Sequence, residues 1–336
     1  MRLKALIVLG VTLGLASACR PVATPQGADS APSVTPGFTA TATFEPLPTR
    51  TFTPEPSPTA TLEPTPDLSP DLDCGETFCS AAWPGVLARP IGPEGTRTID
   101  PTYPYASTRN GTLEPHHGVE FPNGAGTPVL AAQDGEVVFA GQDDLTVLGP
   151  YTGFYGNVVI VRHAGLFEGR DLYTLYAHLS EMDVSVGEMV TLGQRIGKVG
   201  MTGAADGAHL HFEVRLDEND YAHTTNPVLW LAPLAPNAGG EGAALAGLLL
   251  DAWGQPIDQF TLSLERLNPD GSLAQRFYPS TYYPVGVNAN PVSNENFAIT
   301  DLPPGDYRLA YISNGYVQVT FTLAPGSLGF IKLPPE

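Results

Sequence analysis

The chain has 336 residues, enough for two domains of ordinary size, and its 34 Pro and 36 Gly mean that a good part of it cannot be regular helix. The formal net charge is -19, from 35 acidic and 16 basic residues, and no basic stripe offsets it. Nucleic-acid phosphates would be repelled, so the charge argues against a nucleic-acid partner.

Residues 1–19 have the pattern of an export signal. A basic start precedes an apolar run over residues 5–18, which is too short to span a bilayer as a permanent helix. The run ends in Leu-Ala-Ser-Ala-Cys, which resembles a bacterial lipobox and implies a lipid on Cys19. Ala16 stands where Leu is usual, so ordinary cleavage after Ala18 stays open. We expect an exported protein of the cell envelope, anchored on the outer face of the membrane if Cys19 is lipidated.

A linker rich in Thr and Pro follows over residues 20–72. Such a segment buries too little apolar surface to offset the entropy of ordering it, and its prolines favour extended polyproline II structure. The composition therefore predicts a disordered tether.

The next segment, residues 73–105, leads into the first domain and contains Cys74 and Cys79. With Cys19 assigned to lipid, these two cysteines form a pair that closes a very short loop in an oxidising compartment. A disulfide is the expected state. Metal binding is the alternative, although no His lies near the pair in the sequence.

Residues 106–235 show strands and turns with little helical periodicity. Three runs of β-branched and aromatic residues, 136–140, 157–162 and 171–176, are bounded by Gly and Asp turn signals. Short strands at short intervals predict a mostly antiparallel sheet domain.

Strand geometry explains the spacing of the histidines in this domain. In the stretch 208–216, His209 and His211 share one face with Glu213 and Arg215, while the apolar residues between them occupy the other face. If residues 116–120 are extended, His116 and Glu120 also share a face. Two His and one carboxylate leave a fourth position on zinc open for water, as in catalytic zinc sites.

The motifs of this domain resemble those of the lysostaphin-type zinc metallopeptidases. The resemblance rests on six segments in the same order and spacing, namely His-X-Gly-X-Glu at 116–120, Gly-Thr-Pro-Val at 126–129, Asp-Gly-X-Val at 134–137, Tyr-Gly-Asn at 155–157, Tyr-Ala-His-Leu-Ser at 176–180 and His-Leu-His-Phe-Glu at 209–213. One departure is Glu120, where the family usually has Asp.

The resemblance implies roles for five side chains. His116, Glu120 and His211 would bind one zinc ion, and His178 and His209 would flank the activated water. We predict His209 as the general base and His178 as the electrostatic partner, with the reverse assignment open. The other histidines, His117, His163 and His223, are expected to be structural or exposed.

Residues 241–336 follow a Gly-containing joint and show period-two alternation separated by turns. The expected strands lie at 246–251, 261–264, 296–299, 306–311 and 317–321, which predicts a small β-sandwich. The stretch 297–307 resembles the carboxypeptidase-regulatory-like domains of the transthyretin type. Without His or Cys, this part is expected to be an accessory module, either for packing or for binding polymer, and its partner is unknown.

The sequence thus predicts an all-β chain, in which a disordered tether precedes a peptidase domain with an open groove and a β-sandwich. The family resemblance implies a zinc endopeptidase that hydrolyses peptide cross-links of bacterial peptidoglycan. The alternative is a weak or inactive peptidase-like module that binds wall peptides or activates another hydrolase. An adhesin of two β-modules would not account for the His residues of these motifs.

Overall fold

The structure is a computed structural model that describes residues 77–336, apart from 84, 236–239, 283–284, 313–314 and 334–336. The predicted signal peptide, the lipidation site Cys19, the tether and Cys74 lie outside the described residues. Within them, no helix has the length and apolar character needed to cross a membrane. The described chain is built from strands and two short 3₁₀ helices, so the predicted all-β class is confirmed.

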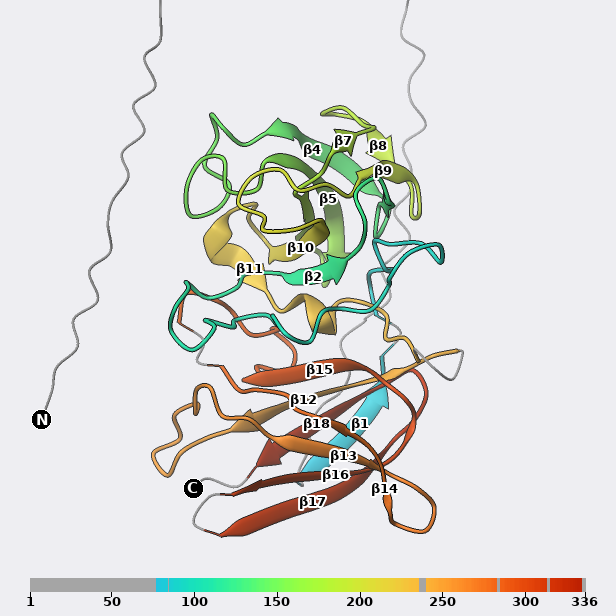
Figure 1. Ribbon diagram of the computed structural model, residues 1–336, viewed down its shortest axis with the longest axis vertical. Coiled ribbons are helices and arrows are strands. Elements are labelled where there is room, and N and C mark those ends of the chain that lie inside the picture. Colours follow the sequence, from blue (N-terminus) through green and yellow to red (C-terminus); the bar gives the residue numbers. More distant parts are fainter. Residues whose placement is uncertain (1–76, 84, 236–239, 283–284, 313–314, 334–336) are drawn as a thin grey trace, which may run out of the picture. The chain divides into compact units, whose positions relative to one another are not determined.

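The first part of the structure contains two antiparallel sheets (Figure 1). The larger sheet has the strand order β11-β10-β6-β5-β4-β8, and β2 pairs with β10 as well; the smaller has the order β3-β9-β7. The strands are β2 (Val119–Pro122), β3 (Pro128–Leu130), β4 (Gly135–Gln142), β5 (Asn157–Phe167), β6 (Arg170–Ala177), β7 (Glu181–Met182), β8 (Met189–Val190), β9 (Arg195–Lys198), β10 (His209–Leu216) and β11 (Thr224–Thr225). The 3₁₀ helices η1 (Tyr221–His223) and η2 (Pro227–Leu229) flank β11. The three strands predicted for this part correspond to β4, β5 and β6.

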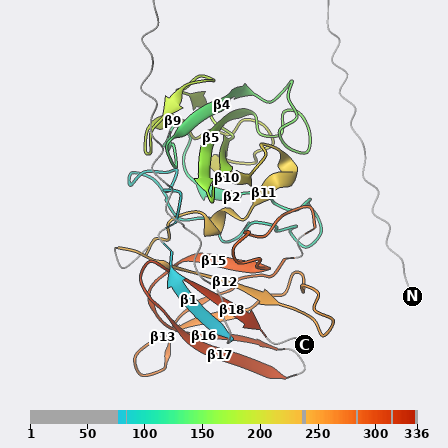
Figure 2. The same cartoon turned by 180° about the vertical axis from the view of Figure 1, so that it is seen from behind.

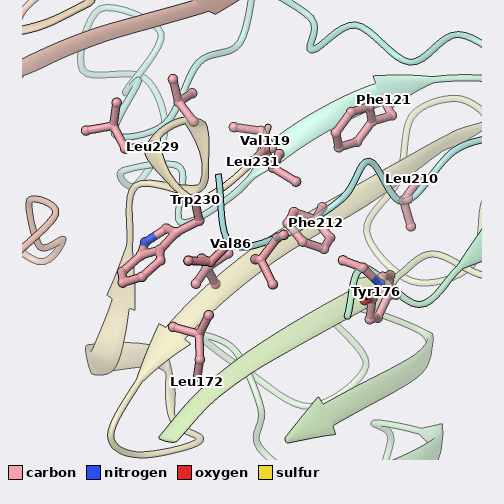
Figure 3. Packing of buried hydrophobic residues seen from close by; sticks show 14 of the residues in the cluster. Val86, Val119, Phe121, Leu172, Tyr176, Leu210, Phe212, Leu229, Trp230 and Leu231 are labelled. Atoms are coloured by element: carbon pink, nitrogen blue, oxygen red, sulfur yellow. Dashed lines mark hydrogen bonds between the residues drawn. The ribbon is translucent and has the colours of Figure 1, made fainter. Parts of the chain in front are cut away.

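Strand β10 is central to this sheet, and its two faces differ as the sequence predicts. Leu210, Phe212 and Val214 are fully buried in the main apolar cluster. Figure 3 shows Leu210 and Phe212 together with Phe121 of β2 and Tyr176 of β6. Truncating a buried aromatic such as Phe212 to alanine costs about 3–5 kcal/mol, so this packing fixes the position of β10 firmly.

The opposite face of the same sheet carries a smaller apolar cluster. Its buried members are Leu148, Tyr155, Val158, Ile160, Leu175 and Ala177. His211 of β10 pairs in register with Ala177 of β6, and Glu213 pairs with Leu175. The polar face of β10 therefore lies beside this cluster, with Tyr155 close to it.

The last part of the chain forms two four-stranded sheets, with orders β1-β18-β12-β15 and β14-β13-β16-β17. The strands are β1 (Phe78–Ala82), β12 (Ala243–Leu249), β13 (Ser263–Leu267), β14 (Leu273–Phe277), β15 (Phe297–Leu302), β16 (Gly305–Ile312), β17 (Tyr316–Leu323) and β18 (Ser327–Leu333). All pairs are antiparallel except β12 with β18. The five strands expected here correspond to β12, β13, β15, β16 and β17.

Strand β1 comes from the segment that precedes the first domain, yet it pairs with β18 from the end of the chain (Figure 2). Cys79 lies in β1 and is disulfide-bonded; Cys74, its predicted partner, lies outside the described residues. The chain thus enters the sandwich sheet, forms the first domain and returns to the sandwich. The sequence did not predict this pairing.

The two parts share buried contacts. Trp230 and Leu231 of the first part belong to the same apolar cluster as Leu328 and Phe330 of β18. The side chain of Arg89, only 1% exposed, forms an ion pair with Asp301 of β15. Asp301 also accepts a hydrogen bond from the backbone of Leu234 at 2.9 Å. The sandwich is therefore packed onto the first domain over a buried surface.

Candidate metal centre

Three side chains converge at the edge where β2 meets β10. The register pairs Glu120 with His211, and His116 precedes β2 by three residues. His116 Nε2 lies 3.0 Å from Glu120 Oε1 and 3.3 Å from His211 Nδ1, and His211 Nδ1 lies 3.0 Å from Glu120 Oε1. One donor atom from each residue lies within 4.8 Å of the other two. All three are at most 9% exposed.

The outer nitrogen of His116, which is the ring nitrogen that points away from the candidate metal position, is hydrogen-bonded to backbone carbonyls. Its Nδ1 donates to Tyr103 O at 3.1 Å and to Pro104 O at 3.3 Å. The Tyr103 ring also stacks on the imidazole, with the ring centroids 3.9 Å apart. A proton fixed on Nδ1 leaves the lone pair of Nε2 free for a metal.

The outer nitrogen of His211 is held by a buried carboxylate. Its Nε2 donates to Glu213 Oε1 at 3.1 Å. Glu213 in turn accepts from the guanidinium of Arg215 at 2.7 Å and from the hydroxyl of Tyr155. Burial raises the pKa of Glu213, but Arg215 and His211 more than offset this and lower it to about 2. The ionised Glu213 fixes the proton of His211 on Nε2, so the lone pair of Nδ1 faces the candidate metal position.

Glu120 supplies the negative charge. Its Oε1 faces His116 and His211, while its buried Oε2 lies 3.0 Å from His209 Nε2 without a well-formed hydrogen bond. Burial raises the pKa of Glu120, but the surrounding imidazoles lower it well below its usual range. Although Glu is longer than Asp, both carboxylate oxygens of Glu120 lie 3.0 Å from an imidazole nitrogen of the site.

Gly118 lies between the two ligands of the first motif, where the backbone passes close to β10. A Cβ at this position would lie 2.6 Å from Cε1 of His211 and 2.7 Å from the carbonyl oxygen of Phe212. Any side chain here would displace the imidazole. Glycine is therefore required at position 118, because the backbone there approaches β10 too closely for a side chain.

His178 and His209 lie beside the three ligands, with their ring centroids 4.8 Å apart. His178 follows β6 at a φ of 59°, a conformation rare for a residue with a side chain and one found at functional sites. Its Nδ1 donates to Thr202 O at 2.8 Å, and Nδ1 of His209 donates to Gly207 O at 2.9 Å. Each ring therefore keeps Nε2 as the nitrogen that can accept a proton.

The surroundings of these two rings shift their pKa values in opposite directions. Burial and the neighbouring imidazoles lower the pKa of His178 to about 4. Burial also lowers the pKa of His209, but the Glu120 carboxylate more than offsets this and raises it. A cation bound to Glu120 would weaken that effect, so the assignment of the base to His209 stays a prediction.

The other histidines lie elsewhere. His117 Nδ1 is 2.7 Å from Thr224 Oγ1, and its ring stacks on Tyr221. His163 is buried between Asp134 O and Thr174 Oγ1. His223 forms a partly exposed ion pair with Asp220.

The residues present fit a zinc ion. Two imidazoles and one carboxylate are a common donor set of catalytic zinc sites, which leave one position for water. The outer nitrogens of both ligand imidazoles are hydrogen-bonded to a carbonyl or a carboxylate, as metal-ligating histidines usually are. The structure therefore brings together all five predicted side chains, three around the candidate metal position and two beside it.

Sequence reasoning missed four supporting residues. Strand parity placed Glu213 and Arg215 on the face of the ligands, and this was the available signal for their role. Tyr155 lies in the Tyr-Gly-Asn segment of the resemblance, but no role was predicted for it. Tyr103 comes from a loop, and nothing in its spacing connects it with His116.

Known proteins resemble part of this chain. The sequence model of peptidase family M23 matches residues 114–224. The DD-carboxypeptidase/endopeptidase Mpg of Neisseria meningitidis is 37% identical over 131 residues, which are 39% of this chain and 26% of that protein. The peptidoglycan DD-endopeptidase ShyA of Vibrio cholerae is 41% identical over 102 residues, 30% of this chain and 20% of that protein.

Among solved structures, the catalytic domain of the antimicrobial peptidase lysostaphin from Staphylococcus simulans is similar. It is 33% identical, with a TM-score of 0.31, and the match covers 37% of this chain and 83% of that domain. The chain spans about a quarter or less of the length of the two curated relatives. The matched region contains all six of the motifs, and the predicted family resemblance is confirmed for residues 114–224, which match peptidase family M23.

Proposed function

We propose that the protein is a zinc-dependent metalloendopeptidase that hydrolyses peptide cross-links of bacterial peptidoglycan. The observation that carries the proposal is the convergence of His116, Glu120 and His211, with His178 and His209 beside them. The name of the relative ShyA, a peptidoglycan DD-endopeptidase, supports the substrate class.

The side chains of the site would have different chemical roles. When bound, zinc would polarise a carbonyl and activate water. His116, Glu120 and His211 would hold the ion, and Glu213 and the carbonyl of Tyr103 keep the two imidazoles oriented. His178 and His209 each hold a proton on Nδ1, so Nε2 is the atom that takes up a proton or, once protonated, gives it to the leaving amine.

A surface depression of about 600 Å³ lies at the end of β2 and the start of β10. It is lined by polar and small residues, and Ala208, next to His209, and Pro122 of β2 lie on its wall. A peptide with both ends extended needs open space on either side of the cleaved bond. The depression supplies open space beside Ala208, the residue before His209.

The alternative is a peptidase-like module that binds wall peptides without cleaving them. A module that only binds has no need of an open metal position or of oriented imidazoles beside it. Here all five side chains are present, and the outer nitrogens of the two ligand imidazoles have hydrogen-bond partners. These observations favour the enzyme.

The test is incubation of the purified chain with peptidoglycan of several cross-link types, followed by identification of new amine ends. We expect new amines from one cross-link class, and their loss when a chelator removes the metal. Restoration by added zinc would link the activity to the ion. Binding to peptidoglycan without any new amine would favour the alternative.

We also propose that the mature chain is held at the cell envelope by lipid on Cys19. The lipobox-like end of the export signal supports this location, as do the names of relatives that act on peptidoglycan. Mass spectrometry of the mature N-terminus is expected to show a lipid-modified cysteine. An unmodified Cys19 at the N-terminus would refute the anchor while leaving export intact.

A further inference from the structure

The segment 103–107 encloses His116 from several sides. The carbonyls of Tyr103 and Pro104 accept from its imidazole, and the Tyr103 ring covers one face of it. Backbone hydrogen bonds join Ala106 N to His116 O at 2.7 Å and His116 N to Ser107 O at 3.0 Å. The position of the first metal ligand therefore depends on where this segment lies.

Tyr105, in the middle of that segment, is anchored on the sandwich side of the molecule. Its hydroxyl accepts from Asn288 N at 3.1 Å and lies 2.9 Å from Asn288 O and 3.2 Å from Thr224 O, either of which takes its proton. The side chain is 4% exposed and its ring meets that of Tyr282 edge to face. Figures 1 and 2 show the chain before β15, which contains Asn288, beside the chain before β2.

Asn288 also holds a second segment near the metal ligands. Its Nδ2 donates to Ala222 O at 2.7 Å and to Thr224 O at 2.8 Å. Thr224 is bonded through Oγ1 to His117, the residue next to His116. One asparagine thus connects the two stretches of backbone that hold residues 116 and 117.

The loop that carries Asn288 is itself fixed by a buried carboxylate. Glu295, 1% exposed, accepts from Tyr282 at 2.8 Å, from Ser293 at 2.6 Å and from the backbone of Asn290 at 3.0 Å. It also accepts from Asn226 of the first domain at 3.2 Å. These hydrogen bonds fix the loop 288–296, and with it the position of Asn288, which bonds to Tyr105 and Thr224.

We propose that this loop of the C-terminal sandwich is a positioning element of the metal centre, acting on His116 through Asn288 and Tyr105. The proposal rests on the proposed zinc-dependent function and deepens it, since it gives the sandwich a part in building the site. Neither residue touches the candidate metal position. Their contribution is to fix the backbone that orients a ligand, as outer hydrogen-bond partners do in metal sites.

The test measures zinc affinity of the full chain by competition with a chelator at neutral pH. Tyr105→Phe removes the hydroxyl alone, and Asn288→Ala removes the amide from a side chain on the surface, where truncation leaves no cavity. Each variant is expected to bind zinc about tenfold more weakly, the lower end of the loss seen when outer partners of a metal ligand are removed. The melting temperature of each variant is recorded alongside.

Tyr307→Phe is the matched control. Tyr307 is fully buried in the sandwich, and its hydroxyl donates to Pro303 O at 2.5 Å, with no link to residues 103–107. It should lose stability comparably and keep wild-type zinc affinity. Equal affinity in Tyr105→Phe, Asn288→Ala and wild type would overturn the inference, as would an equal loss in the control. A wild type that binds zinc but cleaves no peptidoglycan contradicts only the proposed activity.

Discussion

Replacement of His211 by alanine is expected to abolish zinc binding by the folded chain and, with it, peptidoglycan hydrolysis. His211 supplies one of three donor atoms, and its Nδ1 lies 3.0 Å from Glu120 and 3.3 Å from His116. Two remaining donors leave zinc too weakly held to survive dialysis. Metal analysis of the dialysed protein should fall from about one zinc per chain to none.

The fold should tolerate this change, because Glu213 keeps its ion pair with Arg215 at 2.7 Å when the imidazole is removed. His163→Ala is the matched control, since His163 is similarly buried but bonds to Asp134 O and Thr174, away from the group. The control should keep its zinc. A folded His211→Ala chain with wild-type zinc content would show that the metal lies elsewhere.

Much of the fold and of the site followed from local patterns. Alternation along residues 208–216 predicted which side chains of β10 enter the core and which face the site, and the register confirms it by pairing His211 with Glu120. Turn signals and alternation located eight further strands, although several of their ends differ by a few residues. These features depend on neighbours in sequence, which is why a single sequence reveals them.

What could not be predicted depends on contacts between distant residues. The pairing of β1 with β18 joins two ends of the chain, and neither strand carries a signal for its partner. The same holds for Tyr103 on His116 and for Asn288 on Tyr105, which are set by packing between loops. The C-terminal sandwich was predicted as an accessory module for packing or for binding polymer, and the buried core that it shares with the first domain could not be read from its own strands.

His178→Asn and His209→Asn are expected to stop hydrolysis while zinc stays bound. Asparagine retains an N–H donor near the position of Nδ1, so the bonds to Thr202 O and Gly207 O survive, and it tolerates the positive φ at position 178. Each variant lacks Nε2, the atom that moves the proton. Losing a general acid or base lowers kcat by about 10²–10⁴-fold, whereas zinc content should equal that of the wild type.

The dependence of kcat on pH separates the two roles. The variant that lacks the base should lose the acid limb of the profile, because that limb reports protonation of the accepting nitrogen; the variant that lacks the electrostatic partner should keep the limb at reduced height. His223→Asn, on the surface, is the control and should match the wild type. Full activity in either site variant would remove that histidine from the mechanism, and the other histidine would then have to act with the metal ligands alone.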